Sequence, residues 1–280
     1  MITIIFAPPR TGKTCFLTYV GRQAMFNSER NLMMRNEIEN KIQNGFTNIK
    51  TIPRHCVSAN YDITGRMFGY SLRYNRRINP YRLGFANEFV KTHFNLPYEV
   101  ICITEAQKYL NSRMSRNFPD WQSRWYEQHG HNNLDIFLDT HRPMLIDVNI
   151  RELSHFIEII KLNVHKDKYG MIQGMTWTIR EIENSSLFDR YMSSGKKDTS
   201  CYTEKNITAD FNVFECYNSQ SCKPNFYKGH MDEDFDYEQS KPLQENIEAY
   251  IEYLEKNDDE LPVNFYKKPE SKKKEYVYEF

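Results

Sequence analysis

Ile2-Thr3-Ile4-Ile5-Phe6-Ala7-Pro8-Pro9-Arg10-Thr11-Gly12-Lys13-Thr14 is the stretch of this sequence that decides the fold. Its first five residues are apolar or β-branched, which predicts a short buried strand. The apolar run 15–20 that follows predicts the start of a helix. Between them lies the pattern G-x-x-x-x-G-K-[ST], and strand, loop and helix are the context that this phosphate-binding motif requires. Ala7 replaces the first glycine, a mild departure because alanine can also form a compact turn.

The loop predicts a binding site for ATP and Mg²⁺. Backbone N–H groups of such a loop surround the phosphates, and the N-terminus of the next helix adds partial positive charge. Gly12 lets the backbone approach the ligand, Lys13 reaches the β- and γ-phosphates, and the Thr14 hydroxyl holds Mg²⁺. The residues assigned to the nucleotide are Pro9, Arg10, Thr11, Gly12, Lys13, Thr14 and Cys15. The alternative is a G-K-T that stands by chance in a turn before a helix.

Further apolar runs predict the rest of a layered α/β fold. Core strands are expected over 56–60, 99–105 and 134–140, and a hairpin over 156–164 and 171–182. Helices are expected from the loop to about residue 25, and over 28–44 with Ser28 as its cap, 106–114, 121–128 and 146–153. Four strands separated by helices indicate a mainly parallel sheet flanked by helices, the architecture of a P-loop NTPase. Ligands of such sheets bind at the carboxyl ends of the strands.

The length of 280 residues allows one large domain or one domain with an extension. Because the hydrophobic pattern weakens past residue 195, we expect an NTPase domain over 1–195 and a less regular C-terminal extension over 196–256. The extension includes an acidic helix over 243–256. Residues 257–280 have the composition of a flexible charged tail.

Charge is distributed unevenly although the net charge is zero. Residues 1–150 carry 19 Lys and Arg against 12 Asp and Glu, whereas residues 230–280 carry 7 against 15. A basic N-terminal part suits phosphate or nucleic acid, and an acidic tail suits solvent or a partner. Ordinary solvated surface is the alternative.

The sequence predicts a chain that works in a reducing cytoplasm. It enters a strand at once, without a signal peptide, and no run approaches the roughly 20 apolar residues that span a bilayer. The six cysteines form no C-x-x-C pair, so a zinc site lacks support, and a metal site of Cys201, Cys216 and Cys222 with His230 is the weaker alternative. Cys15 and Cys102 are expected in the core.

Residues 61–84 mix arginine with aromatic residues. These are Arg66, Arg73, Arg76, Arg77 and Arg82 among Tyr61, Phe68, Tyr70, Tyr74 and Tyr81. Such a mixture contacts nucleic acid by charge and stacking. The alternative, slightly favoured for any single residue, is a surface insertion whose aromatic side chains pack on the domain.

The strand over 99–105 carries the chemistry that hydrolysis requires. ATPases of this class place Asp-Glu at such a strand end, where Asp holds Mg²⁺ through water and Glu polarises the attacking water. Here Thr104 stands at the Asp position and Glu105 keeps the second, so Thr14, Thr104 and Glu105 are the expected metal-site residues. A glutamate that only caps the next helix is also compatible with the pattern.

On the following strand, His141 is expected beside the γ-phosphate as a polar sensor; a loop histidine that only packs is the alternative. An arginine acting across a subunit interface is expected as well, and the candidates are Arg142, Arg113 and Arg124. The expected catalytic residues are therefore Glu105, His141 and Arg142.

At these motifs the sequence resembles the zonular occludens toxin (Zot) domain family, the assembly ATPases of filamentous phages, which are related to FtsK/HerA pumping ATPases. The resemblance spans about residues 1–195, and it rests on the order and spacing of several loose motifs. These are Ile4–Thr14, Val57–Tyr61, Ile101–Tyr109 with Arg113, His129–Ile136, Thr140–Pro143, Asp147–Leu153 and Phe188–Gly195.

The resemblance implies a RecA/FtsK-like sheet and an ATP-driven motor for phage assembly that extrudes or packages DNA. It implies a ring of identical subunits, single-stranded DNA or a phage DNA–protein complex as substrate, and phage or host membrane proteins as partners. The chain departs from the family at Thr104, where Asp is usual, and at His141, where Gln is frequent. It also lacks a membrane-spanning helix, so attachment to the host inner membrane, if it occurs, is peripheral.

Two further functions stay open. Thr104 brings no charge, which favours a nucleotide-binding scaffold with weak turnover that recruits assembly partners. A small-molecule kinase shares the same loop but needs a lid and substrate-binding arginines after the core strands, and the motifs over 129–153 fit the assembly family better.

Overall fold

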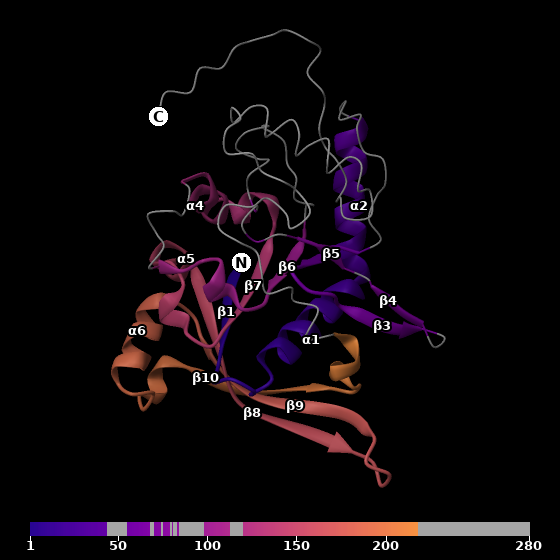
Figure 1. The fold of residues 1–280 in the computed structure, drawn as a ribbon. Coiled ribbons are helices and arrows are strands. Elements are labelled where there is room, and N and C mark those ends of the chain that lie inside the picture. The colour runs from indigo at the N-terminus through magenta and orange to yellow at the C-terminus, as the bar shows by residue number, and fades with distance from the viewer. Residues whose placement is uncertain are drawn as a thin grey trace, which may run out of the picture.

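The computed structural model describes residues 1–43, 55–67, 70–73, 75–78, 80, 83, 98–112 and 120–217 (Figure 1). Several sequence expectations lie outside these residues. They are the roles of Arg82, Arg113, Cys222 and His230, the acidic helix over 243–256 and the tail over 257–280.

The elements follow the predicted alternation of strands and helices. The strands are β1 (Ile2–Phe6), β2 (Val57–Ala59), β3 (Thr64–Met67), β4 (Tyr70–Arg73), β5 (Arg76–Arg77), β6 (Val100–Ile103), β7 (Asp135–Thr140), β8 (Ser154–Lys166), β9 (Ile172–Ile182) and β10 (Thr203–Ala209). The α-helices are α1 (Lys13–Met25), α2 (Ser28–Gln43), α4 (Asp120–Glu127), α5 (Val148–Glu152) and α6 (Ser185–Ser193). Short 3-10 turns include η2 (Ala106–Lys108), η4 (His129–Asn132), η6 (Thr199–Cys201) and η7 (Val213–Cys216).

Within the described residues, one eight-stranded sheet has the order β10-β9-β8-β1-β7-β6-β2-β5. Every pairing from β8 to β5 is parallel, and the two antiparallel pairings are those of β9 with β8 and with β10. Because β1 lies between β8 and β7, the loop that follows it opens at the centre of the carboxyl edge. The fold is a mainly parallel sheet flanked by helices, as the sequence predicted.

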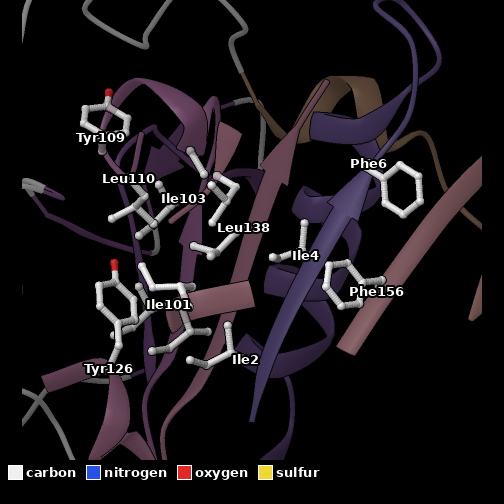
Figure 2. Close-up of a cluster of buried hydrophobic side chains, with 14 of the residues drawn as sticks. Ile2, Ile4, Phe6, Ile101, Ile103, Tyr109, Leu110, Tyr126, Leu138 and Phe156 are labelled. Atoms are coloured by element: carbon white, nitrogen blue, oxygen red, sulfur yellow. The ribbon is translucent and has the colours of Figure 1, made fainter. Parts of the chain in front are cut away.

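Alternating residues of β1 pack on opposite faces of the sheet, because side chains of a strand point alternately to its two sides. Ile2, Ile4 and Phe6 join the core under α4, α5 and α6, which Figure 2 shows around Ile101, Leu138 and Phe156. Ile5 joins the second core under α1, with Phe16 and Trp177. Burial on both faces explains why β1 has a continuous apolar sequence.

Two local predictions are wrong. An α-helix was expected over 106–114, but in the described part of this range the chain forms the 3-10 turn η2 and then pairs Asn111 with Ile146 in an isolated bridge. Ser28 was expected to cap α2, but the Asn27 side chain accepts the Arg30 N–H at 2.9 Å and takes this role. Asparagine and serine are both good helix caps, so the pattern alone could not distinguish them.

The sheet continues past residue 195, where the hydrophobic pattern of the sequence weakens. β10 pairs with β9 along its full length, and Val213 is buried in the core that covers α1. Most residues of β10 are exposed on both sides, which is why the strand lacks an apolar pattern. We propose that the folded domain extends to Tyr217 rather than ending at Gly195.

Candidate nucleotide site

The phosphate loop lies between β1 and α1 and ends at Gly12, which has φ 85° and ψ 24°. This left-handed conformation is readily available only to glycine. No side chain caps the N-terminus of α1, and the first bond of its backbone ladder runs from Phe16 N–H to Gly12 C=O. The N–H groups of Lys13, Thr14 and Cys15 therefore precede the first backbone bond of the helix, an arrangement that fits a phosphate.

Lys13 is buried, and its Nζ donates to the Pro8 carbonyl at 3.0 Å. Thr11 Oγ1 donates to the same carbonyl at 2.7 Å, so two side chains of the loop share one backbone acceptor within it. An ammonium held at a carbonyl of the loop can move to a phosphate oxygen with little reorganisation of the backbone. Pro9 and Arg10 are exposed at the loop tip, and Arg10 has a left-handed backbone with φ 64°.

Cys15 can offer a ligand only its backbone N–H. Its side chain is fully buried and its Sγ lies 3.4 Å from Met175 Sδ. Cys15 is therefore a core residue, as the sequence predicted, and its burial raises the pKa of the thiol to about 12. Cys102 is likewise fully buried.

Thr14 and Thr104, two of the expected metal-site residues, lie together. Their Oγ1 atoms are 3.3 Å apart, although the residues come from different elements. Both hydroxyls donate to the carboxylate of Asp139, a residue that the sequence analysis missed: Thr14 Oγ1 to Oδ2 at 2.8 Å and Thr104 Oγ1 to Oδ2 at 2.9 Å. An Asp inside the apolar run 134–140, one residue before Thr140-His141, was the available signal.

Asp139 is fully buried near the carboxyl end of β7. Its Oδ1 accepts the backbone N–H of Glu105 at 2.9 Å. Burial raises the pKa of Asp139, and the hydrogen bonds from Glu105, Thr14 and Thr104 act in the opposite direction. The carboxylate therefore joins the ends of β6 and β7 to the first turn of α1.

Glu105 has the left-handed backbone conformation, with φ 55° and ψ 41°. A residue with a Cβ atom adopts this region at a cost, and such strain is concentrated at functional sites. Its Oε2 accepts from Gln107 Nε2 at 2.6 Å and lies 3.8 Å from His141 Nδ1. Gln107 Nε2 is also 3.1 Å from His141 Nδ1, so the three side chains form one polar cluster.

The buried Oε1 atom of Gln107 has no hydrogen-bond partner among the described residues. A buried acceptor without a donor costs free energy unless water or a ligand satisfies it. The Gln107 side chain is hydrogen-bonded to Glu105, the residue expected to polarise the attacking water. A water or ligand bound at this site would supply the donor that Gln107 Oε1 lacks.

The candidate arginines among the described residues have exposed side chains outside the cluster of Glu105, Gln107 and His141. Arg142 has an exposed side chain, and its backbone N–H donates to Thr140 Oγ1 at 3.0 Å. Arg124 lies in the last turn of α4 and is also exposed. Exposure is compatible with a role across a subunit interface.

In the described part of the chain, no group of three or more His, Cys, Asp or Glu side chains could hold a metal ion by itself. Mg²⁺ at a nucleotide keeps several waters and needs only one or two protein oxygens besides the phosphates. The hydroxyls of Thr14 and Thr104 with the Asp139 carboxylate fit that requirement. No helix among the described residues is long and apolar enough to cross a membrane.

Tyr61, one of the aromatic residues considered for contact with nucleic acid, packs on the domain instead. It is buried, and its OH lies 3.2 Å from Thr18 Oγ1 in the core under α1. Arg66 lies in β3, Arg73 in β4, and Arg76 and Arg77 form β5.

The solved structures that are similar to this chain include one bacterial and one viral protein. The N-terminal domain of zonular occludens toxin from Neisseria meningitidis is 19% identical with a TM-score of 0.46, and the likeness covers 78% of this chain and 98% of that one. The genome packaging NTPase B204 of Sulfolobus turreted icosahedral virus 2, solved in complex with ATP-gammaS, is 9% identical with a TM-score of 0.35, covering 74% and 95%. Among curated proteins no significant match is found.

The family model of zonular occludens toxin (Zot) matches residues 89–223. The matched segment begins after the phosphate loop and contains Thr104, Glu105, Asp139 and His141. This match confirms the resemblance to the zonular occludens toxin family that the order of the sequence motifs indicated.

Proposed function

We propose that this chain binds ATP with Mg²⁺ and hydrolyses it as a motor of phage assembly. The observation that carries the proposal is the convergence of an uncapped helix N-terminus, Lys13, Thr14 and Glu105 at one edge of the sheet. Phosphoryl transfer depends mainly on positioning and on electrostatic stabilisation, and these groups supply both.

Each residue has a role in this proposal. The loop from Pro9 to Cys15 binds the phosphates, with Lys13 exchanging the Pro8 carbonyl for a phosphate oxygen. The Thr14 hydroxyl is the protein ligand of Mg²⁺, which when bound would neutralise charge on the phosphates. Glu105 orients and polarises water, and His141, held through Gln107, senses the γ-phosphate.

The wider role follows from the Zot resemblance together with the charge distribution. We expect a ring of identical subunits in which Arg142, Arg124 or Arg113 reaches the neighbouring site. The substrate in this proposal is single-stranded DNA or a phage DNA–protein complex, with the arginines of β3, β4 and β5 as candidate contacts. The chain would act in the cytoplasm or at the inner membrane, through phage or host membrane proteins.

Steady-state ATP hydrolysis by the full chain, with and without single-stranded DNA, tests this function. Lys13→Ala should abolish nucleotide binding, whereas Lys205→Ala, which removes an exposed ammonium paired with Glu181, should not. Glu105→Gln should lower the hydrolysis rate by about 10²- to 10⁴-fold while nucleotide still binds. Glu204→Gln is the matched control, since Glu204 is an exposed carboxylate.

The outcomes separate the motor from the scaffold that the sequence left open. Hydrolysis that DNA stimulates and Lys13→Ala removes supports the motor. Lys13-dependent binding without hydrolysis, with or without DNA, would favour the scaffold. Hydrolysis unchanged in Glu105→Gln would show that Glu105 is not the base.

A further inference from the structure

The pairing of β6 with β7 places the carboxylate of Asp139 beside Thr104, the position where the resembled family usually has Asp. β6 and β7 pair in parallel, with Ile103 opposite Leu138, so Thr104 and Asp139 are the next residues on each strand. The β1 partner of Asp139 is Ile5, which packs in the core under α1. Asp139 therefore lies on the face of the sheet that carries α1 and the Thr14 hydroxyl, and it reaches that hydroxyl directly.

Among the described residues, no basic side chain balances a charge on Asp139. The side chain is fully buried, and no lysine or arginine in the described ranges forms an ion pair with it. Its partners are two hydroxyls and one backbone N–H, which satisfy the oxygens but bring no positive charge. Burying an ionised carboxylate costs free energy unless a cation accompanies it, so this arrangement suits a bound cation.

We propose that Asp139, from the strand next to β6, supplies the acid of the Mg²⁺ site that Thr104 does not, and this rests on the proposed nucleotide binding. Asp139 is a positioning residue here: its Oδ2 accepts the hydrogen bond from the Thr14 hydroxyl, which leaves the oxygen lone pairs of Thr14 for the metal. Carboxylates that accept a hydrogen bond from a ligand orient it and increase its basicity. Thr104 is a second donor to the same carboxylate, so in this protein the acid lies on β7 and the hydroxyl follows β6.

The competing explanation is that Asp139 only ties β6, β7 and α1 together. Asp139→Asn distinguishes the metal role from the purely structural role. The asparagine side chain has the same shape and keeps one acceptor oxygen, but it carries no charge. The exchange variant Thr104→Asp/Asp139→Thr is more discriminating, since it returns the acid to β6 and puts a hydroxyl on β7. Asp135→Asn is the matched control, because it removes the charge of another β7 aspartate, which pairs with Arg30 and not with Thr14.

The experiment measures Mn²⁺ binding to the full chain with ATP-gammaS by electron paramagnetic resonance, beside nucleotide affinity in EDTA and thermal unfolding. We expect Asp139→Asn to weaken Mn²⁺ binding by about 10- to 100-fold, as loss of an outer carboxylate usually does. Nucleotide affinity in EDTA should stay within about two-fold, because the phosphate loop is unchanged. The exchange variant should recover most of the Mn²⁺ affinity, and Asp135→Asn should retain it.

Wild-type Mn²⁺ affinity in Asp139→Asn would overturn the proposal. If Asp139→Asn does not fold, the exchange variant decides: Mn²⁺ bound as in the wild type supports the proposal, and loss of Mn²⁺ from a folded exchange variant overturns it. A wild-type chain that binds no nucleotide in EDTA or in Mg²⁺ contradicts the proposed function, and the metal role falls with it. Nucleotide binding with an unaltered metal response in Asp139→Asn contradicts the metal role alone.

Discussion

Asn60 and Thr104 exchange two hydrogen bonds in the core of the protein. The Thr104 N–H donates to Asn60 Oδ1 at 2.9 Å, and Asn60 Nδ2 donates to the Thr104 carbonyl at 3.1 Å. Asn60 follows β2 and Thr104 follows β6, and both are buried. One amide thus satisfies both backbone groups at the point where β6 turns toward Glu105, and it fixes the position of that turn.

Replacing Asn60 by alanine should therefore destabilise the fold. The change leaves a buried N–H and a buried C=O of Thr104 without partners, which costs about 2–5 kcal/mol in the free energy of unfolding. Urea denaturation followed by circular dichroism measures this. Asn206→Ala, at an exposed asparagine of β10, should change the stability by much less. Equal effects of the two changes would contradict the anchoring role of Asn60.

Glu105→Gly should make the protein more stable while removing its proposed base. The left-handed backbone at Glu105 costs about 1–2 kcal/mol for a residue with a Cβ, and glycine avoids this cost but loses more entropy on folding. The expected net gain is about 0.5–1 kcal/mol, seen as a higher melting temperature. Glu105→Gln keeps the Cβ and should melt close to the wild type. A Glu105→Gly variant no more stable than Glu105→Gln would show that the conformation is not strained.

Gly12→Ala should impair the phosphate loop for two separate reasons. A Cβ atom at residue 12 would lie 2.7 Å from Leu162 Cδ2, and φ 85° is unfavourable for alanine. Leu162→Ala removes the first obstacle and not the second, so the double variant should regain only part of the lost stability and nucleotide affinity. Gly130→Ala is the control, because a Cβ there meets nothing within 4 Å. Full recovery in the double variant would mean that the backbone conformation costs nothing.

His129 should make the fold less stable in mild acid. Burial lowers the pKa of His129, while the hydrogen bond to the Tyr126 carbonyl acts in the opposite direction. Because the unfolded chain takes up a proton more readily than the native one, stability should fall as the pH drops below the ordinary histidine pKa of about 6.5. His129→Gln should flatten the fall of melting temperature between neutral and mildly acidic pH. His131→Gln, at an exposed histidine, should leave the slope unchanged; equal slopes in both variants would contradict this assignment.

The sequence predicted the order of elements well because each depends on local pattern. The apolar run of β1, the G-K-T that opens α1 and the runs of β6 and β7 are each visible without their neighbours. The helix expected over 106–114 was wrong because the chain turns at Glu105 to pair Asn111 with Ile146, a contact between distant residues. The exposed strand β10 was missed because its pairing with β9 is specified by backbone hydrogen bonds rather than by apolar side chains.

By itself, the sequence determined the phosphate loop, the mainly parallel sheet and the clustering of Thr14, Thr104, Glu105 and His141 at its carboxyl edge. Those inferences need only periodicity and the rule that parallel strands end on the same side. Only the tertiary structure identified Asp139 as the carboxylate that both threonines contact, because strand register places Thr104 beside it and the packing of α1 brings Thr14 to it. Register is a property of the assembled sheet, and a linear sequence in which residues 104 and 139 are far apart does not contain it.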